Sequence, residues 1–582
     1  MSANTETGSG EMISLAQYIL DRLYEAGVHD LFGVPGDFVL GFFNFLEKSK
    51  IKYIGTCNEL EAAYAADGYA RMKGIGAVST TYNVGELSAM NGVAGAWAEM
   101  VPVVKLTGCP ATPHFKKGTL LHHTLGDYEA ALKMFKRITV DAEILLDIEK
   151  APEQVDRILT NCLRHSRPVY IGIPSDLVKR MVPKPKQPFK KPEREHSNPQ
   201  ALKEAVSEVM GMLKAAKAPM MIPGVELHRF NLVEMWQGLL ETSGLPYATM
   251  MLSKSILSED HPQFIGLYSG ARSREGVRKP VEDSDCVLIF GEMLTDFNTG
   301  GFSAALKPDR CVSVMRDSVQ VSHHVYHEVY IWDFIQALHE EMVASAYKPS
   351  LAEPITPAYL TCVHRATHRK QTMFQVDGSK QLTQHRFFER IANFLKPTDI
   401  VLAETGSAMF AVAETMMPHG AKFVAQIFYG SIGYTTGAAL GTAIAEKDKR
   451  TVLFIGDGSF QVTVQGLSTM IKEGVKPVIF LINNDGYTIE RVIVDHPYND
   501  VQPWKYAQLV EAFGGGKGIK VSNEGELEKA LEVANTATEL TFIEAVFDRW
   551  DCNESLKAAG RQMAISNELL EKEGEAEAVQ QN

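Results

Sequence analysis

Two short loops rich in glycine and oxygen-bearing side chains follow neighbouring apolar runs in the last third of the sequence. Asp457 lies in a Gly-Asp-Gly-Ser loop after one run, and Asn484 and Gly486 lie in an Asn-Asp-Gly loop after the next. If both runs are parallel strands, their carboxyl ends, and hence the two loops, lie at one edge of a sheet. Asp457, Asn484 and the carbonyl of Gly486 then offer the oxygen ligands that Mg²⁺ prefers.

The same loops have features of a diphosphate site, because Mg²⁺ usually keeps phosphate oxygens among its ligands. Glycines at 456 and 458 let the backbone approach such a group closely, and Ser459 opens a helical stretch that runs to residue 473 and offers its positive end. A lone Gly-Asp-Gly mostly marks a turn, but here an Asn follows 27 positions after the Asp. Neither Gly-x4-Gly-Lys-Ser/Thr nor a helix-opening Gly-x-Gly-x-x-Gly is present, so a nucleotide site is not indicated.

Five further side chains able to transfer protons lie in distant parts of the sequence: Asp37, Glu59, His122, His123 and Glu490. Carboxylates beside imidazoles can hold different protonation states, because their charges shift one another's pKa values. Taken alone, Glu59 can equally be a helix-start glutamate that interacts with the helix dipole, and adjacent loop histidines are more often surface residues. The residues by themselves leave both interpretations open.

The elements that must position these residues form three segments, separated by proline-rich stretches at 182–200 and 347–359. Each segment alternates apolar runs with helical patterns, which predicts parallel sheets, and an apolar repeat before Gly27 predicts a helix over 15–26. Strands are expected at 31–34, 53–56, 77–82, 101–107, 219–222, 286–290, 311–314, 400–403, 452–455 and 478–482. We therefore expect an α/β fold of three doubly wound parallel-sheet domains, at residues 11–185, 200–346 and 360–565.

Composition and charge exclude several classes of protein. The chain has 582 residues, too many for one core, and its 45% hydrophobic and 22% charged residues are typical of a globular protein. No run approaches the roughly 18 apolar residues of a membrane span, so no membrane partner is expected. The net charge of -13 and the lack of a long Lys/Arg stripe argue against a nucleic acid partner.

Several features favour a cytoplasmic location. The first ten residues lack the basic and then apolar pattern of a signal peptide, so no export is expected. Seven cysteines form no Cys-x-x-Cys pair, which fits a reducing compartment. Residues 571–582 are rich in Glu, Ala and Gln and are expected to form a solvated end.

A wider set of motifs resembles the fungal pyruvate and indolepyruvate decarboxylase family, whose members depend on thiamine diphosphate. In the first segment the motifs are VPGDF at 34–38, NEL at 58–60, YAADGYAR at 64–71, VGELSA at 84–89 and LHHTLG at 121–126. In the last segment they are AETG at 403–406, YGSIG at 429–433 and NDGYTIE at 484–490. The resemblance covers nearly the whole chain.

The resemblance implies thiamine diphosphate and Mg²⁺ as cofactors. It implies that Glu59 hydrogen-bonds the pyrimidine ring and favours its imino tautomer, whose nitrogen then removes a proton from the thiazolium carbon. Ile432 would support the bend between the two rings, because a β-branched side chain is stiff. The other implied cofactor contacts are Ser407, Gly430, Ser431, Asp457, Gly458, Ser459, Asn484, Gly486, Tyr487 and Ile489.

The implied reaction is the non-oxidative decarboxylation of a small-molecule 2-oxo acid through an ylid and an enamine, with pyruvate giving acetaldehyde and CO₂. Asp37 and Glu490 would transfer protons, while His122 and His123 orient the substrate and the intermediates. The proton-donating histidines argue against the alternative of a carboligase, since protonation drains the intermediate that carboligation needs. An inactive scaffold is disfavoured because the acidic residues and Asn484 are all present.

The preferred substrate depends on the side chains that line the pocket. By alignment with the family these are Phe297, Met409, Tyr429, Ile489 and Ile493. Phe297 favours a small pocket and hence pyruvate, whereas the flexible Met409 can admit longer chains. Decarboxylation of larger aromatic or branched 2-oxo acids, such as phenylpyruvate and indolepyruvate, therefore stays an alternative.

Three further expectations concern assembly and regulation. Family sites lie across a subunit interface, with Glu59 of one subunit facing Asp457 of another, so a homodimer or homotetramer is implied.

Some fungal relatives carry a regulatory cysteine in the middle domain, but residues 219–229 contain none, which puts substrate activation through a thiol in doubt. The histidines His323, His324 and His327 lack a fourth ligand at an obvious spacing, so we expect a surface role for them.

Overall fold

The computed structural model describes residues 11–117, 119–351, 354–358 and 374–569. Contacts within the chain define two compact units. The first holds the described residues of 1–194, 436–447 and 465–475, and the second holds those of 195–435, 448–464 and 476–582. The expected tail at 571–582 lies outside the described residues. No helix within the described ranges has the length and apolar character needed to cross a membrane.

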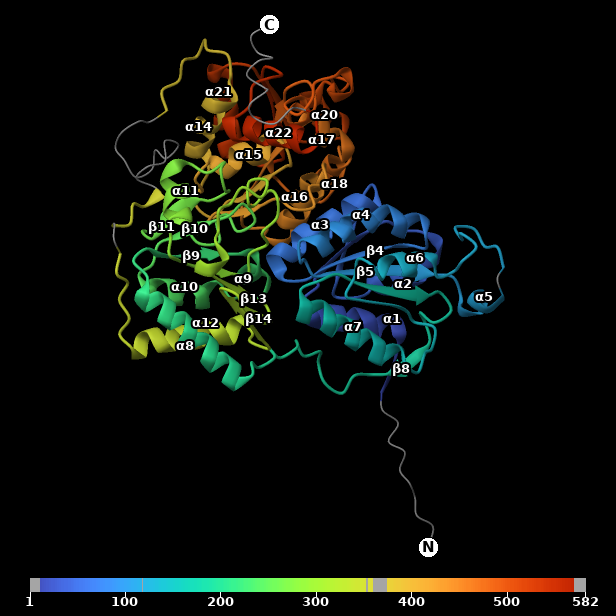
Figure 1. Ribbon diagram of the computed structural model, residues 1–582. Coiled ribbons are helices and arrows are strands. Elements are labelled where there is room, and N and C mark those ends of the chain that lie inside the picture. Colours follow the sequence, from blue (N-terminus) through green and yellow to red (C-terminus); the bar gives the residue numbers. More distant parts are fainter. Residues whose placement is uncertain (1–10, 118, 352–353, 359–373, 570–582) are drawn as a thin grey trace. The chain divides into compact units, whose positions relative to one another are not determined.

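The N-terminal segment folds around a six-stranded parallel sheet in the order β3-β2-β4-β5-β7-β6. In Figure 1, α1 and α7 lie on one side of β4 and β5, and α3 and α4 lie on the other. The strands of this sheet are β2 Asp30–Gly33, β3 Lys52–Gly55, β4 Gly76–Thr81, β5 Val103–Cys109, β6 Asp141–Ile144 and β7 Val169–Pro174, while β1 Met12–Ser14 and β8 Met181–Pro183 pair with each other in a separate two-stranded sheet. The helices are α1 Leu15–Ala26, α2 Asp37–Leu46, α3 Glu59–Lys73, α4 Val84–Ala98, α5 Thr112–Lys117, α6 Ala130–Phe135 and α7 Ala151–His165.

Helix α1 shows how local sequence sets these elements. Ser14 caps it, its hydroxyl accepting a hydrogen bond from the backbone N–H of Gln17 at 3.2 Å, and Gly27 ends it with φ at 117°. The helix predicted over 15–26 is therefore confirmed. Strands β4, β5 and β7 are buried along their whole length, as expected for central parallel strands with helices on both faces.

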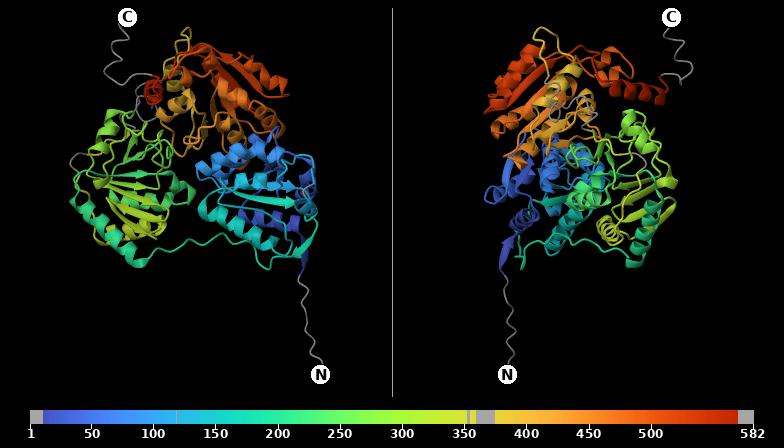
Figure 2. Two further views of the ribbon diagram at one scale, coloured as in Figure 1. Left: turned by 45° about the vertical axis from the view of Figure 1, so that its right-hand side comes forward. Right: turned by 90° about the vertical axis from the view of Figure 1, so that its left-hand side faces the viewer.

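The middle segment has a seven-stranded sheet in the order β11-β10-β9-β12-β13-β14-β15, whose strands are drawn in green and yellow-green in Figure 2. Strands β14 and β15 pair antiparallel, so this sheet adds to the expected parallel core an edge that the apolar pattern did not indicate. Its strands are β9 Pro219–Pro223, β10 Tyr247–Thr249, β11 Phe264–Leu267, β12 Cys286–Phe290, β13 Cys311–Met315, β14 Ser318–Val321 and β15 His324–His327. Its helices are α8 Pro199–Ala215, α9 Val225–Arg229, α10 Val233–Ser243, α11 Glu275–Glu282, the 3-10 turn Pro308–Arg310 and α12 Ile331–Ala344.

The C-terminal segment contains a second all-parallel sheet of six strands, in the order β17-β16-β18-β19-β21-β20. Its strands are β16 Ile400–Ala403, β17 Lys422–Val424, β18 Thr451–Gly456, β19 Val478–Asn483, β20 Lys517–Val521 and β21 Thr541–Val546. Its helices are α14 Gln384–Phe394, α15 Ser407–Glu414, α16 Tyr434–Ala445, α17 Asp457–Val462, α18 Gly466–Lys472, α19 Thr488–Arg491, α20 Leu509–Ala512, α21 Glu524–Thr536 and α22 Glu554–Ser566, with 3-10 turns at Pro497–Asn499 and Tyr506–Gln508. The α/β fold class with three such domains is confirmed.

The helical stretch expected from Ser459 to residue 473 is in fact two helices. The chain leaves the helical path after Val462, where Thr463 takes φ of -134°. The hydroxyl of Thr463 donates a hydrogen bond to the carbonyl of Gly433 at 2.8 Å, and this contact fixes the break. The prediction of one continuous helix is therefore wrong, because a contact distant in sequence overrides the local pattern.

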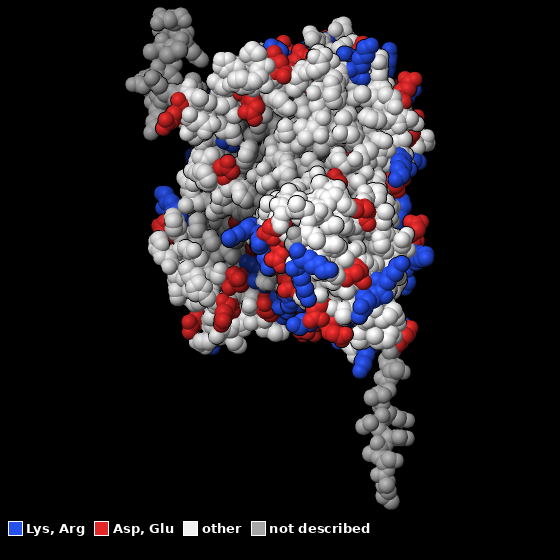
Figure 3. All heavy atoms as spheres, turned by 90° about the vertical axis from the view of Figure 1, so that its right-hand side faces the viewer, with Lys and Arg blue, Asp and Glu red and all other residues white. Residues whose placement is uncertain are grey.

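Lysine and arginine side chains are interspersed with aspartate and glutamate on the face shown in Figure 3. The three histidines that had invited a metal interpretation all lie exposed, on or beside β15. His324 lies 3.1 Å from the Glu208 carboxylate. The one group of three metal-ligating side chains among the described residues does not include these histidines.

Candidate active site

The Gly-Asp-Gly and Asn-Asp-Gly loops meet at one edge of the C-terminal sheet. Strands β18 and β19 pair in parallel, and α17 begins on Asp457 itself. One carboxylate oxygen of Asp457 accepts the backbone N–H of Gly458 at 2.9 Å, and the other accepts that of Gly486 at 2.9 Å. The aspartate therefore joins the two loops, in the arrangement that the parallel-strand argument requires.

The environment of Asp457 is that of a buried anion. Only 1% of the residue is exposed. Burial raises the pKa of Asp457 to about 7, opposed by the two backbone N–H groups and, more weakly, by the guanidinium of Arg491. A bound cation would relieve this desolvation, so the oxygen-rich donor set of Asp457, Asn484 and the Gly486 carbonyl fits a divalent metal.

Arg491 fixes the second loop and was missed in the sequence. One of its terminal nitrogens donates to the carbonyl of Asn484 at 2.9 Å, and the other donates to the carboxylate of Asp500 at 2.6 Å and to the carbonyl of Asp485. The residue is 2% exposed. The only sequence signal was an arginine directly after the motif at 484–490, and this position does not distinguish a buried arginine from a surface charge.

Two glycines are required by close contacts in these loops. A Cβ at position 458 would lie 2.4 Å from the ring of Tyr487, and one at position 486 would lie 2.2 Å from the carbonyl of Asn499. Gly486 also has φ of 126°, a left-handed conformation that side chains rarely adopt. The loops thus form a close-fitting backbone cradle beside Tyr487.

A third loop, which contains Tyr429, Gly430, Ser431 and Ile432, is tied to the same sheet edge through buried side chains. The side-chain oxygen of Gln426 accepts the backbone N–H of Ser431 at 2.9 Å. The carboxylate of Glu404, at the end of β16, accepts the backbone N–H and the hydroxyl of Thr435 at 3.0 and 2.6 Å. Burial raises the pKa of Glu404 to about 7, against these hydrogen bonds.

The predicted pocket residues are only partly brought together. Met409 is fully buried in the C-terminal core, and Phe297 and Ile489 pack against that same core. The ring of Phe297 lies 6.2 Å from that of Phe410. Tyr429 is 38% exposed, and Ile493 is half-buried two residues after α19 ends at Arg491. Ser407 begins α15, and its hydroxyl accepts the side-chain N–H of Asn484 at 3.4 Å.

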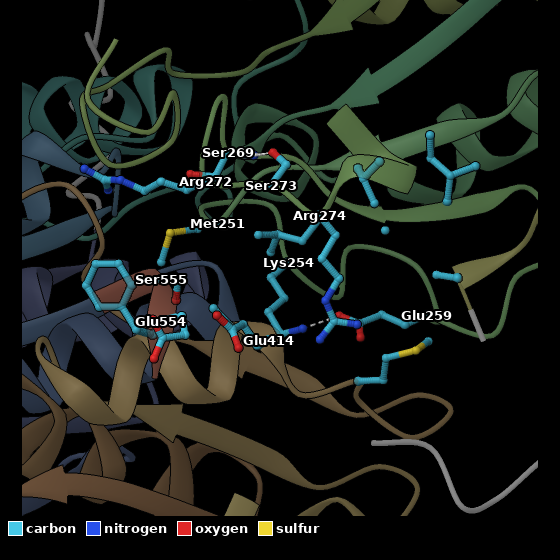
Figure 4. A pocket seen from close by; sticks show the side chains of 18 of the residues that line it. Met251, Lys254, Glu259, Ser269, Arg272, Ser273, Arg274, Glu414, Glu554 and Ser555 are labelled. Atoms are coloured by element: carbon cyan, nitrogen blue, oxygen red, sulfur yellow. Dashed lines mark hydrogen bonds and ion pairs between the residues drawn. The ribbon is translucent and has the colours of Figure 1, made fainter. Parts of the chain in front are cut away.

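A separate cavity of about 490 Å³ lies in the second unit, between loops of the middle segment and helices α15 and α22. None of the predicted site residues lines it. Figure 4 shows Lys254 and Arg274 pointing toward Glu259, whereas the side chain of Arg272 extends away from them. Lys254 donates to Glu259 at 2.7 Å, so the wall of this cavity contains an ion pair.

Asp37, His122 and His123 form a cluster in the first unit. A ring nitrogen of His122 lies 2.6 Å from one oxygen of Asp37, and a ring nitrogen of His123 lies 3.8 Å from the other. The ring of Phe38 stacks on that of His122, with centroids 4.9 Å apart. The predicted fourth member, Glu490, is exposed on α19 and belongs to the second unit.

Asn83, a second residue missed in the sequence, holds the histidine loop. Its side-chain N–H donates to the carbonyl of His123 at 2.7 Å. Asn83 has φ of 47° and His123 has φ of 68°, so both stand in the sparsely populated left-handed region. Such strain at neighbouring residues is typical of a functional site.

Glu59 begins helix α3, directly after the cap residue Asn58. Its carboxylate lies against the first turn of α4, where a Cβ on Gly85 would come within 3.0 Å of a carboxylate oxygen. Glu59 is half-buried. The first turn of α4 thus restricts the carboxylate, while part of the residue stays exposed.

Three family models match the chain. One described as thiamine pyrophosphate enzyme, N-terminal TPP binding domain, matches residues 13–130. The corresponding central domain matches residues 206–342, and the C-terminal TPP binding domain matches residues 404–545. Together with the three α/β sheets and the paired loops, they define the class of the protein as the thiamine pyrophosphate enzymes.

Full-length relatives narrow the class. The chain is 35% identical to a pyruvate decarboxylase of Aspergillus fumigatus, over 95% of this chain and 98% of the relative. It is 36% identical to pyruvate decarboxylase isozyme 3 of Saccharomyces cerevisiae, over 95% and 99%. It is 34% identical to an alpha-keto-acid decarboxylase of Mycobacterium leprae, over 96% and 97%. The chain belongs to the pyruvate-decarboxylase-like family of thiamine pyrophosphate enzymes, which confirms the resemblance of its motifs.

Proposed function

We propose that this protein is a thiamine-diphosphate- and Mg²⁺-dependent decarboxylase that converts pyruvate to acetaldehyde and CO₂. The observation that carries the proposal is the buried carboxylate of Asp457, held at 2.9 Å from the N–H groups of both Gly458 and Gly486. Similarity over nearly the full length to proteins named pyruvate decarboxylase supports the choice of reaction.

In this proposal Asp457, Asn484 and the Gly486 carbonyl would hold Mg²⁺, whose charge would favour a diphosphate at the same loops. Gly458, Ser459 and the start of α17 provide backbone N–H groups to the phosphate oxygens. Ser407, Gly430, Ser431, Ile432, Tyr487 and Ile489 make the other cofactor contacts. When bound, thiamine diphosphate supplies an acidic ring carbon whose conjugate base adds to the keto carbon and accepts the electron pair that CO₂ leaves behind.

The protein's own acids and bases would manage the protons. Glu59 hydrogen-bonds the pyrimidine ring of the cofactor and so sets its tautomer. The short contact between Asp37 and His122 supports a role for this cluster in holding a proton, with His123 on the other carboxylate oxygen. Glu490 follows Ile489 on α19 and supplies the second carboxylate.

We propose a homodimer or homotetramer, in which Glu59 of one subunit faces the cofactor on Asp457 of another. The six described cysteines, all unpaired, support a location in the reducing cytoplasm. Phe297 and Met409, which pack in one core with Phe410, support a small substrate such as pyruvate.

The test is aldehyde release from a panel of 2-oxo acids from pyruvate to indolepyruvate, with and without thiamine diphosphate and Mg²⁺. Cofactor-dependent acetaldehyde with the highest kcat/KM for pyruvate is expected. A higher kcat/KM for the larger acids would reassign the substrate, and release of acyloin in place of aldehyde would favour the carboligase. No turnover of any acid by protein with bound cofactor would overturn the proposal.

A further inference from the structure

Lys105 is a fully buried lysine at the centre of the N-terminal sheet. It lies in β5, between β4 and β7, and none of it is exposed. Its ammonium group donates to the hydroxyls of Thr80 and Thr107, each at 2.8 Å, and to the carbonyl of Leu106 at 2.7 Å. All three ammonium hydrogens are therefore used, at a position where an unpaired charge would be costly.

Glu86 is also fully buried, and burial raises its pKa, opposed first by the charge of Lys105. The carboxylate of Glu86 accepts the hydroxyl of Tyr170 at 2.8 Å and the backbone N–H of Asn83 at 2.7 Å. Burial lowers the pKa of Lys105 to about 8. The charge of Glu86 opposes this effect most strongly, and Cys109 and then Glu59 oppose it more weakly.

The hydroxyl of Thr80, which accepts from Lys105, donates to the carbonyl of Thr81 at 3.1 Å, and the Thr80 side chain and the Glu59 carboxylate both lie against Gly85. A Cβ on Gly85 would lie 3.0 Å from a carboxylate oxygen of Glu59 and 3.2 Å from the Cβ of Thr80. Thr80, which accepts from Lys105, and the Glu59 carboxylate thus pack against the same point of the backbone.

Hydrogen bonds also connect Glu86 to the loop that contains His123. Glu86 accepts from the backbone of Asn83, and the side chain of Asn83 donates to the carbonyl of His123 at 2.7 Å. Glu86 therefore connects this buried region to the histidine loop, while Lys105 lies on the side of Thr80 and Glu59.

We propose that Lys105 is a positioning residue for Glu59: its buried ammonium fixes Thr80, whose side chain lies with the Glu59 carboxylate against Gly85, and this packing holds the carboxylate in the orientation that activates the cofactor. Glu86 ties the same network to the loop of His123. This inference rests on the proposed role of Glu59 and adds a residue that acts on the cofactor only through it.

The test compares Lys105→Met, Lys105→Met/Glu86→Gln, Thr80→Val and Glu59→Gln with the unaltered chain. The double variant leaves no uncompensated buried charge, and Thr80→Val removes only the hydroxyl that accepts from Lys105 and donates to the Thr81 carbonyl, so these two variants keep the test open if Lys105→Met alone fails to fold. Lys254→Met, which removes another buried lysine that donates to polar groups, in that case to Glu259, is the control for the general loss of a buried ammonium group.

The main readout is deuterium exchange at the acidic thiazolium carbon of bound thiamine diphosphate, measured without substrate by quenched NMR. Cofactor affinity and Tm are measured alongside it. We expect exchange to slow by at least about tenfold in the double variant and by a smaller factor in Thr80→Val, with cofactor affinity within about threefold. Lys254→Met should leave the exchange rate unchanged.

Each outcome decides one assignment. Normal exchange in the double variant would show that Lys105 only neutralises Glu86 and would overturn the inference, as would normal exchange in Thr80→Val if Lys105→Met and the double variant both fail to fold. Normal exchange in Glu59→Gln would instead reject the proposed role of Glu59. Absence of aldehyde from the unaltered chain would reject the proposed reaction, and this result is separate from the exchange measurements.

Discussion

The carboxylate of Asp457 accepts the backbone N–H of Gly486 at 2.9 Å, although 29 positions separate the two residues. This single bond joins the ends of two parallel strands and closes the cradle in which we place the metal and the diphosphate. Because the carboxylate is buried, its interaction with a cation is weakly screened by water, and the loss of its charge should be felt strongly.

Replacing Asp457 by Asn should therefore abolish most cofactor binding. We expect the dissociation constant for thiamine diphosphate in the presence of Mg²⁺ to rise by at least about a hundredfold, or about 3 kcal/mol. Titration calorimetry measures this directly. The matched control is Asp485→Asn, an exposed neighbour in the second loop, which should change the affinity by less than about threefold. Equal losses in both variants would contradict a specific role for Asp457.

Gly458→Ala should disturb the same cradle through shape alone. The added Cβ would lie 2.4 Å from the ring of Tyr487, so the ring or the loop must move, at a cost of about 1–3 kcal/mol. We expect a lower Tm for the cofactor-free protein, measured by scanning calorimetry. Gly456→Ala is the control, because nothing lies within 4 Å of its Cβ, and its cost should stay within about 1 kcal/mol.

The sequence predicts the meeting of these loops, since apolar runs separated by helical patterns define parallel strands, and the ends of neighbouring parallel strands coincide. It does not predict residues whose importance comes from contacts distant in the chain. From the sequence, Arg491 would be predicted to be an ordinary surface charge, because its hydrogen bonds to Asn484 and Asp500 are known only from the structure. The break at Thr463 likewise depends on the carbonyl of Gly433.

The positive φ of Asn83 and the burial of Lys105 are invisible to local pattern as well. An asparagine before a helix indicates a cap, and a lysine in an apolar strand indicates an edge. The antiparallel edge of the middle sheet was missed for a related reason, because alternating short runs do not specify which strand pairs with which.

Asn83→Gly should weaken catalysis without a backbone penalty. Glycine keeps φ of 47° but removes the hydrogen bond to the carbonyl of His123. We expect kcat/KM for pyruvate to fall by about five- to tenfold, which corresponds to roughly 1 kcal/mol for one hydrogen bond. Asn83→Ala should add a loss of stability of about 1–3 kcal/mol, because alanine is strained at positive φ. Unchanged kcat/KM in Asn83→Gly would show that the histidine loop does not need this bond.

Glu61, two residues after Glu59, should make stability fall as the pH rises. It is fully buried, and burial raises its pKa from 4.5 to about 7, against weaker contacts with Thr469 and the backbone of Cys57. Because the folded pKa lies above the unfolded one, the contribution to stability is fully present below about pH 4.5 and is lost as the pH passes through about 7. The loss reaches about 3 kcal/mol.

Glu61→Gln should therefore raise Tm relative to the unaltered protein at pH 8, and this advantage should shrink toward pH 5.5, as measured by calorimetry across that range. Glu524→Gln is a control of opposite sign, because its hydrogen bonds with Arg386 lower the pKa of Glu524. Its carboxylate is ionised throughout the same window, so that variant should lower Tm by an amount that hardly changes with pH. A Glu61→Gln effect that is equally independent of pH would show that Glu61 stays charged in the folded protein, with water or a partner compensating its burial.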